Sequence, residues 1–322
     1  MILSKVMMKG SLDFGTSKSY EKAVNLFQHK AETLYKMCLL IKAEDIFNET
    51  NHSLVIPQLV INGSDKFWKN TIYILECMAQ FAQAGHISAW RIRLEDNTLQ
   101  NHIAIEPSGE KLVVQEYKLG VHDLKEGNID DAYHHFSTAI EKYDGHSQAY
   151  ERRGKVSFKR QNFEKAIHDY AKSIELNSFS PKPYFGRALA YAAIGELNLA
   201  VQDLEFAIKN SIPMQPIYWK SRRRKGEYHF LQQQYDKAAF ELKFFTKRDF
   251  KEEDPNFKWK KRALIYYSKS LLELGETQEA RNAWKTAIKI SGSAPIDESI
   301  KKYLDIAFDS NLDTTVSKKI NV

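Results

Sequence analysis

Residues 132–140 read AYHHFSTAI, residues 166–174 read AIHDYAKSI and residues 200–208 read AVQDLEFAI. Each stretch has an alanine first, a bulky residue four positions later, a small residue three positions after that and then an isoleucine, and the spacing is 34 residues both times. Looser copies begin at Ala238 and Ala280, after intervals of 38 and 42 residues. A period of this length is typical of proteins that stack helix hairpins.

A second small residue precedes each of these alanines by about twelve positions. Between the two small positions lie short turn segments that contain glycine or asparagine, such as Gly127-Asn128 and Gly195. Each copy therefore predicts a helix, a turn and a second helix, in which the paired small residues let the helices approach closely. The bulky residue then fills the space against the next copy, and stacked copies bury one continuous core. The upstream small residues are Gly120, Gly154, Ala188, Gly226 and Ser268.

A helical bundle without repeats, with alanines that share a spacing by chance, is the alternative. The agreement at several positions in register within each copy argues against it.

The repeat resembles the tetratricopeptide repeat (TPR), whose pattern places Leu-Gly, Tyr, Ala, Phe and Ala at set positions. Leu119-Gly120 and Phe136 match in the first copy, Tyr150 and Gly154 in the second, and Tyr184 and Ala188 in the third. The closing proline of the pattern is mostly missing or shifted. The resemblance implies a mainly α protein, a right-handed TPR-type α-solenoid of five helix pairs over residues 113–294. A capping helix is expected at 295–310 and a flexible tail at 311–322.

The first 108 residues lack the repeat, and residues 109–112 read as a linker. We expect a small α+β domain, with a β-α-β-β-α-β order as in ferredoxin-like folds, although a helical alternative stays open. Pro57 argues for an edge strand or a break in its apolar run. The expected helices are Ser19–Lys36 and Lys66–Ala84, the apolar runs are Met37–Ile41 and Leu54–Ile61, and Ile87–Leu94 reads as a strand that pairs with Ile103–Ile105.

Composition limits the class of protein further. The chain is 43% apolar, enough for a sizeable core, and no stretch approaches the 18 apolar residues of a membrane span. We read no signal peptide at the start, and two isolated cysteines, Cys38 and Cys77, fit a reducing cytoplasm. Residues 1–110 hold 11 Lys/Arg against 12 Asp/Glu, whereas the remainder holds 36 against 29. The positive second part favours acidic partners.

No pattern of residues indicates catalysis, a cofactor or a metal. The stretch Gly10–Ser17 has two glycines five residues apart, but the lysine of a phosphate-binding loop is replaced by Thr16. We interpret it as a turn into the first helix, with Ser17 or Ser19 as N-cap. His134-His135 lack the further ligands that a metal needs. We therefore expect a non-enzymatic protein.

The run Arg222–Lys225 opens the first helix of the fourth repeat and has three interpretations. It is a solvated basic face, a contact surface for an acidic partner, or an RNA-binding stripe with Tyr218, Trp219 and Trp259 for stacking. Nucleic acid is the least favoured of the three.

The resemblance to TPR proteins also implies a binding site, because the first helices of successive pairs line a concave groove. The side chains implied there combine Lys and Arg with aromatic and aliphatic residues, which suits an acidic peptide with apolar anchors. One TPR subtype clamps the carboxylate of chaperone C-termini, but of its five positions only Lys182 matches here, so we expect no such clamp. The implied groove residues are Tyr117, Lys155, Lys182, Phe185, Leu189, Lys220, Arg223, Arg262, Ile265 and Lys269.

The predicted function is a cytoplasmic scaffold or adaptor that binds a partner protein or peptide in this groove. Two alternatives stay open. In one, the first domain binds a ligand or nucleotide and the repeats regulate it. In the other, the basic helices of repeats four and five bind RNA.

Overall fold

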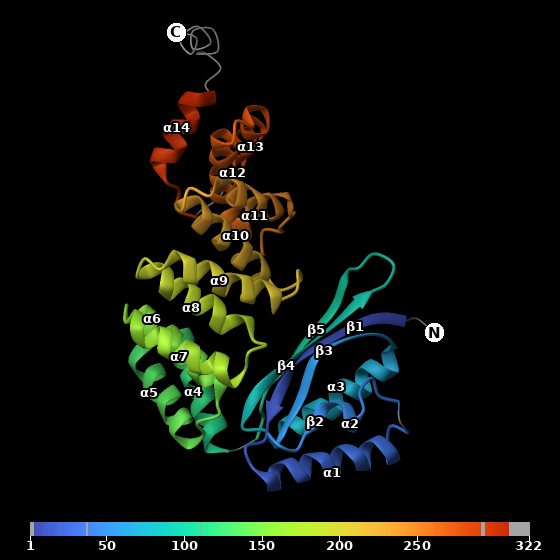
Figure 1. Cartoon of the computed structure of the whole chain (residues 1–322). Coiled ribbons are helices and arrows are strands. Elements are labelled where there is room, and N and C mark those ends of the chain that lie inside the picture. The colour runs from blue at the N-terminus through green and yellow to red at the C-terminus, as the bar shows by residue number, and fades with distance from the viewer. Residues whose placement is uncertain (1–2, 37, 110, 291–293, 309–322) are drawn as a thin grey trace, which may run out of the picture. The chain divides into compact units, whose positions relative to one another are not determined.

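The computed structural model describes residues 3–36, 38–109, 111–290 and 294–308. The predicted tail at 311–322 lies outside these residues. The chain divides into two compact units, Met1–Pro183 and Tyr184–Val322, which are described separately below. The mainly helical class is confirmed, with helix hairpins that follow a small α+β domain (Figure 1).

The first unit begins with a five-stranded antiparallel sheet of order β2-β3-β1-β4-β5. The predicted β-α-β-β-α-β order is observed, with a short helix α2 and a final strand β5 in addition. The elements are β1 (Leu3–Asp13), α1 (Ser17–Thr33), α2 (Ala43–Ile46), β2 (Phe47–Asn48), β3 (Ser53–Ser64), α3 (Asp65–Ala79), β4 (Ala84–Arg93) and β5 (Leu99–Ile105).

The helices of this domain lie on one face of the sheet (Figure 1). Val6, Met8 and Leu12 alternate along β1, are fully buried and pack with Phe27 of α1 and Leu75 of α3. This alternation follows from the two-residue period of a strand. The predicted pairing of Ile87–Leu94 with Ile103–Ile105 is confirmed, since Ile87 lies opposite Ile105.

Two expectations for this domain are wrong. Residues 38–42 form no strand, because side chains of α3 bind their backbone instead: the Leu40 N–H donates to Thr71 Oγ1 at 2.9 Å and Asn70 Nδ2 donates to the Cys38 carbonyl at 3.1 Å. The stretch Gly10–Ser17 was predicted to form a turn into the first helix, but its first four residues, 10–13, belong to strand β1. Pro57 falls where the register of β1 and β3 shifts, so its missing N–H interrupts no regular pairing.

Two complete hairpins follow in the first unit, after β5. They are α4 (Leu112–Glu126) with α5 (Ile129–Lys142), and α6 (Ser147–Lys159) with α7 (Phe163–Leu176). Phe136 of α5 is fully buried and packs with Leu124 of α4 and Val156 of α6. The bulky repeat residue therefore joins one hairpin to the next, as predicted.

The boundary between the units falls within α8 (Pro181–Ala193), the first helix of the third hairpin. The second unit continues with α9 (Leu197–Lys209), α10 (Pro216–Leu231), α11 (Tyr235–Lys247), a 3₁₀ turn η1 (Phe257–Trp259), α12 (Lys260–Glu273), α13 (Thr277–Lys289) and α14 (Glu298–Phe308). Helix α14 packs on α12 through Leu304 and Phe308, so the predicted capping helix is present.

The repeat alanines occupy equivalent places in all five hairpins that the described residues form. Each is the fourth residue of the second helix and has no exposed surface. The upstream small residues face this helix: a Cβ on Gly120 would lie 2.8 Å from the Phe136 ring, and one on Gly226 would lie 2.7 Å from Leu242. The alanines are Ala132, Ala166, Ala200, Ala238 and Ala280.

The turn inside each hairpin also repeats its backbone conformation. Gly127, Gly195 and Gly275 have φ of 91°, 87° and 80°, and glutamines take the same left-handed conformation in the other two hairpins, Gln161 at 59° and Gln233 at 60°. A left-handed residue ends the first helix and lets its last carbonyls find hydrogen bonds. Glycine adopts it without strain, whereas glutamine does so at some cost.

In the second hairpin, and again in the third, a buried ion pair links the two helices of the hairpin. Arg153 donates to Asp169 from Nε and Nη2 at 2.9 and 2.8 Å, and Arg187 donates to Asp203 in the same way at 2.8 Å for both bonds. The pairs recur at the 34-residue period of the repeat, although the sequence analysis did not identify them. The carboxylates are only 3% and 4% exposed, so each depends on its arginine for compensation.

We therefore expect Asp203→Ala to lower the free energy of unfolding by about 3–5 kcal/mol, because it leaves the half-buried Arg187 without its partner. The double change Arg187→Leu with Asp203→Leu should cost much less, since it removes both charges. Urea denaturation measures both, with Asp236→Ala on the exposed start of α11 as the control. An Asp203→Ala loss no larger than that of the control would contradict the role of the pair.

Candidate functional site

The groove positions of the first unit lie on α4, α6 and the start of α8. Tyr117 of α4 is half-buried, with its ring 4.8 Å from that of His146 and 5.9 Å from that of Phe136. Burial raises the pKa of Tyr117 to about 12, so its hydroxyl stays protonated at neutral pH. Lys155 of α6 and Lys182 of α8 are exposed. Of these three predicted residues, the structure leaves the two lysines accessible and encloses the tyrosine.

The α+β domain contacts this part of the groove. The Gly85 N–H at the start of β4 donates to Gln148 Oε1 of α6 at 3.1 Å. The Tyr143 hydroxyl, at the end of α5, hydrogen bonds the Asp13 carboxylate at the end of β1. Gln148 is at one of the positions that the resemblance to TPR proteins implies for the groove. The α+β domain therefore contacts one implied groove position of the second repeat.

A carboxylate from the end of β5 also lies in this region. Glu106 Oε1 is 3.3 Å from His86 Nδ1, and this partner lowers the pKa of Glu106, with further help from the positive charges of Lys182 and Arg152. Arg152 and Lys182 stand at two of the five positions of the chaperone-tail clamp. Part of their positive field is thus directed at a carboxylate of the same chain.

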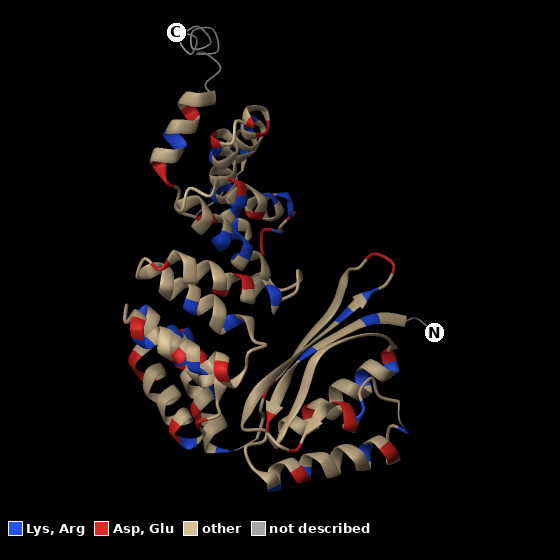
Figure 2. Ribbon diagram, viewed as in Figure 1, with Lys and Arg blue, Asp and Glu red and all other residues tan. Residues whose placement is uncertain are grey.

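In the second unit, the basic run Arg222–Lys225 lies in the middle of α10 and does not open the helix as predicted, and it is not a solvated face. Arg223 is 2% exposed and its Nη1 donates to Glu227 Oε1, while Arg222 Nη1 donates to Glu241 Oε2 at 2.7 Å. Lys225 lies 3.0 Å from Glu205 and 3.1 Å from Glu241. The interpretation as a solvated basic face is wrong, because the run is neutralised by carboxylates that lie outside it in the sequence, on Glu205, Glu227 and Glu241. Figure 2 shows the Lys and Arg residues along α10.

The remaining groove positions of this unit differ in accessibility. Phe185 and Leu189 of α8 and Lys220 of α10 are half-buried. Ile265 of α12 has no exposed surface, so it belongs to the core. The two remaining positions, Arg262 and Lys269, contact the C-terminal segment that was predicted only to cap the last repeat. Arg262 Nη1 donates to the Pro295 carbonyl at 3.0 Å, and Lys269 Nζ lies 3.5 Å from the centre of the Tyr303 ring.

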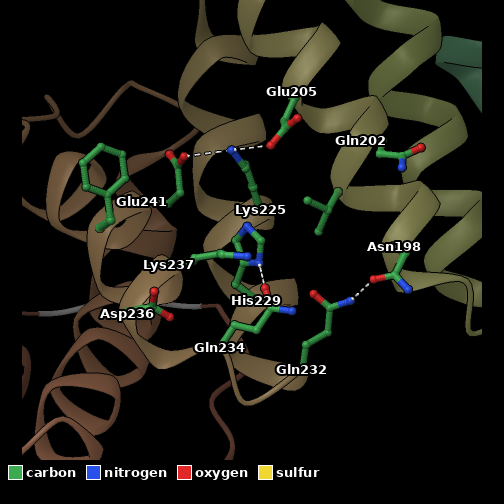
Figure 3. Close-up of a pocket in the computed structure, with 12 residues that line it drawn as sticks. Asn198, Gln202, Glu205, Lys225, His229, Gln232, Gln234, Asp236, Lys237 and Glu241 are labelled. Carbon is green, nitrogen blue, oxygen red and sulfur yellow. Dashed lines mark hydrogen bonds and ion pairs between the residues drawn. The ribbon is translucent and has the colours of Figure 1, made fainter.

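A polar cavity of about 780 Å³ is lined by side chains of α9, α10 and α11 (Figure 3). Its side chains already bond to one another: Gln232 donates to Asn198 at 2.8 Å, His229 pairs with Gln234 at 3.0 Å, and Lys225 is held between two glutamates. The predicted groove residues do not line it. We assign it no ligand.

The glycine stretch and the histidine pair singled out from the sequence form neither a phosphate-binding loop nor a metal site in the described residues. Gly10 lies within β1 and the N-cap of α1 is Thr16, not Ser17 or Ser19, so the glycine spacing is not that of a phosphate loop. His135 is half-buried and pairs with Glu116 at 2.7 Å through Nδ1. Among the described residues no group of three His, Cys, Asp or Glu side chains is arranged to hold a metal. Within the same residues, no helix has the length and apolar character to span a membrane.

The geometry defines a protein of stacked helix hairpins, and comparison with known families agrees. The tetratricopeptide repeat model matches residues 117–181 and 185–242. Residues 117–181 and 185–242 of this chain therefore form tetratricopeptide repeats.

Similar proteins include Hsp70-Hsp90 organizing protein 3 of Arabidopsis thaliana, which is 29% identical over 102 residues that cover 32% of this chain and 18% of the relative. The chain thus matches less than a fifth of that protein's length. Among solved structures, the MamA protein is similar over 55% of this chain and 91% of its own, with 18% identity and a TM-score of 0.46. The first TPR of Spaghetti (RPAP3), solved with the HSP90 peptide SRMEEVD, is similar over 38% of this chain and 93% of its own, at 18% identity and a TM-score of 0.36.

One titratable group beside the groove predicts a pH dependence. His146 is 2% exposed, caps α6 by accepting from the Ala149 N–H at 3.3 Å, and burial lowers its pKa to about 4. Between its ordinary pKa of about 6.5 and this value, the unfolded chain binds the proton and the folded chain does not. Stability from this group is therefore complete above pH 6.5 and falls as the pH drops towards 4, by roughly 3 kcal/mol in total.

The variant His146→Asn keeps a capping side chain but cannot titrate. We expect its stability to change less than that of the unmodified chain between pH 6.5 and 4, as measured by urea denaturation at a series of pH values. Parallel pH profiles for the two proteins would rule out the assignment.

Proposed function

We propose that this chain is a non-catalytic cytoplasmic adaptor that holds a segment of a partner protein against the groove side of its repeats. The observation that carries the proposal is the register of the hairpins. The same alanine is buried at the same place in each one, so the first helices present equivalent positions repeatedly. Solenoids of this kind use such extended surfaces for binding. The free cysteines, Cys38 and Cys77, support a reducing compartment.

The chemistry of the groove supports an acidic partner with apolar anchors. Lys155 and Lys182 are exposed in the first unit, and Phe185, Leu189 and Lys220 are half-buried in the second. Positive charge assists encounter with an acidic segment, whereas apolar contacts hold the bound state. Because the α+β domain contacts Gln148, a partner at the second repeat would share that position with the chain's own β4.

Neither alternative function gains support from a specific observation. A nucleotide site in the first domain would need the glycine stretch to form a loop, and Gly10 is in β1. RNA binding through stacking would need open aromatic faces near the basic helices. The Arg223 guanidinium already lies 4.0 Å from the centre of the Trp259 ring, and Trp219 packs on Phe250.

Affinity capture with mass spectrometry tests the proposal. The bait is the full chain, compared with a Lys155→Glu and Lys182→Glu variant. We expect specific partner proteins with the unmodified chain and their loss with the variant, since both charges face the groove. A matched control, Lys165→Glu with Lys237→Glu, makes the same charge change on exposed sites of α7 and α11, the second helices, and should retain the partners. Recovery of no specific protein, or equal loss with the control, would count against the adaptor.

The relatives raise the question of chaperone tails. Several matched proteins are named Hsp70-Hsp90 organizing proteins, and Spaghetti was solved with an HSP90 peptide. In this chain the five clamp positions hold Tyr117, Val121, Arg152, Lys182 and Gly186, and Tyr117 is half-buried beside His146. A carboxylate clamp needs several donors that converge on one point, and here most of them are missing.

We therefore expect the peptide SRMEEVD to bind this chain no more tightly than the same peptide with an amidated C-terminus. Fluorescence anisotropy with both labelled peptides measures the difference. A preference of tenfold or more for the free carboxylate, about 1.4 kcal/mol, would show that a clamp exists.

A further inference from the structure

Four cationic side chains surround a single tryptophan in the second unit. The guanidinium carbons of Arg223, Arg224 and Arg262 lie 4.0, 5.6 and 5.9 Å from the centre of the Trp259 ring, and Lys258 Nζ lies at 5.8 Å. The residues come from α10, η1 and the start of α12. Attraction to the negative face of an indole offsets only part of the repulsion among these cations.

One carboxylate serves this whole cluster at close range. Glu227 is 2% exposed, and it lies 2.5 Å from Arg223 Nη1, 3.0 Å from Arg224 Nη1 and 3.3 Å from Arg262 Nε. Within 4 Å, the three guanidinium groups therefore share one carboxylate among the described residues, and Asp297 interacts with Arg262 only from farther away. In a site removed from water, this excess of positive charge costs free energy unless another anion balances it.

The base of the cluster also has an unused donor. Arg223 is 98% buried, and its Nε has no hydrogen-bond partner. A buried donor without a partner is unfavourable, and in native structures it commonly marks a place where a ligand or water binds. Burial is the main cause that lowers the pKa of Arg223; Arg224 and Arg262 also lower it, and Glu227 opposes them.

Two lysines form the accessible rim of the same cluster. Lys258 is exposed and Lys220 is half-buried, and among the described residues no carboxylate lies within 4 Å of either amino group. Asp254 is near enough to Lys220 to raise its pKa, but burial, Arg223 and Lys258 together lower it. Lys220 and Lys258 therefore add positive charge without a close carboxylate, at the part of the cluster that is accessible to solvent.

We propose that this cluster, Lys220, Arg223, Arg224, Lys258 and Arg262 around Trp259, is a subsite for the side-chain carboxylates of an acidic peptide segment. The inference rests on the proposed adaptor function and names the chemistry of its partner. Lys220 and Arg223 occupy groove positions of the fourth repeat, so a peptide that follows the groove brings its carboxylates to them. A carboxylate at the rim pairs with the lysines and supplies the second negative charge that the arginines lack.

A peptide fits this surface better than RNA does. Stacking of bases needs an open aromatic face, whereas the Trp259 ring is covered by Arg223 at 4.0 Å. RNA is kept as an outcome of the test.

The test uses the full chain and a fluorescein-labelled, C-terminally amidated peptide of repeated Glu-Glu-Leu-Glu-Glu-Phe. Its counterpart has Gln in place of every Glu. Fluorescence anisotropy should show binding of the Glu peptide that is at least about tenfold tighter than that of the Gln peptide, with an affinity that falls as salt increases. Equal affinity for the two peptides, or no binding of the Glu peptide at low salt, overturns the proposal.

Variants locate the binding. Lys220→Gln with Lys258→Gln should weaken the Glu peptide by about tenfold or more, because two rim contacts are lost. The matched control, Lys165→Gln with Lys237→Gln, changes the net charge equally at exposed sites of α7 and α11 and should stay within about twofold. Equal weakening by both pairs would mean attraction to the overall charge only, which overturns the site.

For a third variant we expect tighter binding of the Glu peptide, the opposite of the effect of the lysine pair. Glu227→Gln removes the internal competitor for the arginines, so its folded fraction, checked by circular dichroism, should bind the Glu peptide more tightly than the unmodified chain does. Weaker binding contradicts the proposal, and if this variant does not fold the lysine pair still decides. Tighter binding of a twelve-nucleotide single-stranded RNA, lost with the lysine pair, would replace the peptide by nucleic acid.

The subsite and the adaptor function can fail separately. If captured partners survive the lysine pair but are lost with Lys155→Glu and Lys182→Glu, the subsite is wrong and the adaptor stands. If the Glu peptide binds as expected and capture recovers no specific protein, the subsite stands and the adaptor is wrong.

Discussion

The close approach of two helices inside each hairpin is the constraint on which this structure depends. Ala132 and its counterparts have no exposed surface, and a Cβ on Gly120 would come within 2.8 Å of the Phe136 ring. At that separation a larger residue on either helix pushes the pair apart, and overpacking of this kind costs about 1–3 kcal/mol. The next hairpin packs on the bulky residue that the small pair positions, so an error in one repeat would reach its neighbour.

Charge adds a second layer to this framework, and it is distributed unequally. Within the second and third hairpins each arginine meets its own aspartate, and the charges balance. At Trp259 three arginines share Glu227, and the balance fails. Local imbalance of this kind is expected where a protein gives up some stability for binding. The first unit differs again, because Glu106 and Gln148 join the α+β domain to charged and polar groups of the helix hairpins.

Much of the fold could be predicted because it follows from periodic patterns. The hairpins follow from the repeat of about 34 residues. The strand pair that places Ile87 opposite Ile105 follows from the alternating pattern of a strand, and the cap helix follows from the amphipathic pattern of a helix. Of the strand expected at Met37–Ile41, Met37 lies outside the described residues and residues 38–41 form no strand, since side chains of α3, distant in sequence, bind the backbone of residues 38–40. The predicted groove residues lie on the first helices of their hairpins, but Ile265 is buried and Lys269 lies against the Tyr303 ring. Those outcomes depend on packing partners, which a position within a repeat does not specify.

The sequence by itself therefore determined the class of the protein, the number and phase of its repeats and the excess of positive charge after residue 110. Each of these depends on residue identity at fixed spacing, or on a simple count of charges. Only the tertiary structure decided which charges are neutralised and which side chains stay accessible. The run Arg222–Lys225 illustrates the difference, because its carboxylates come from Glu205, Glu227 and Glu241 on three helices. Pairing of this kind depends on distances of a few ångströms between segments that only folding brings together.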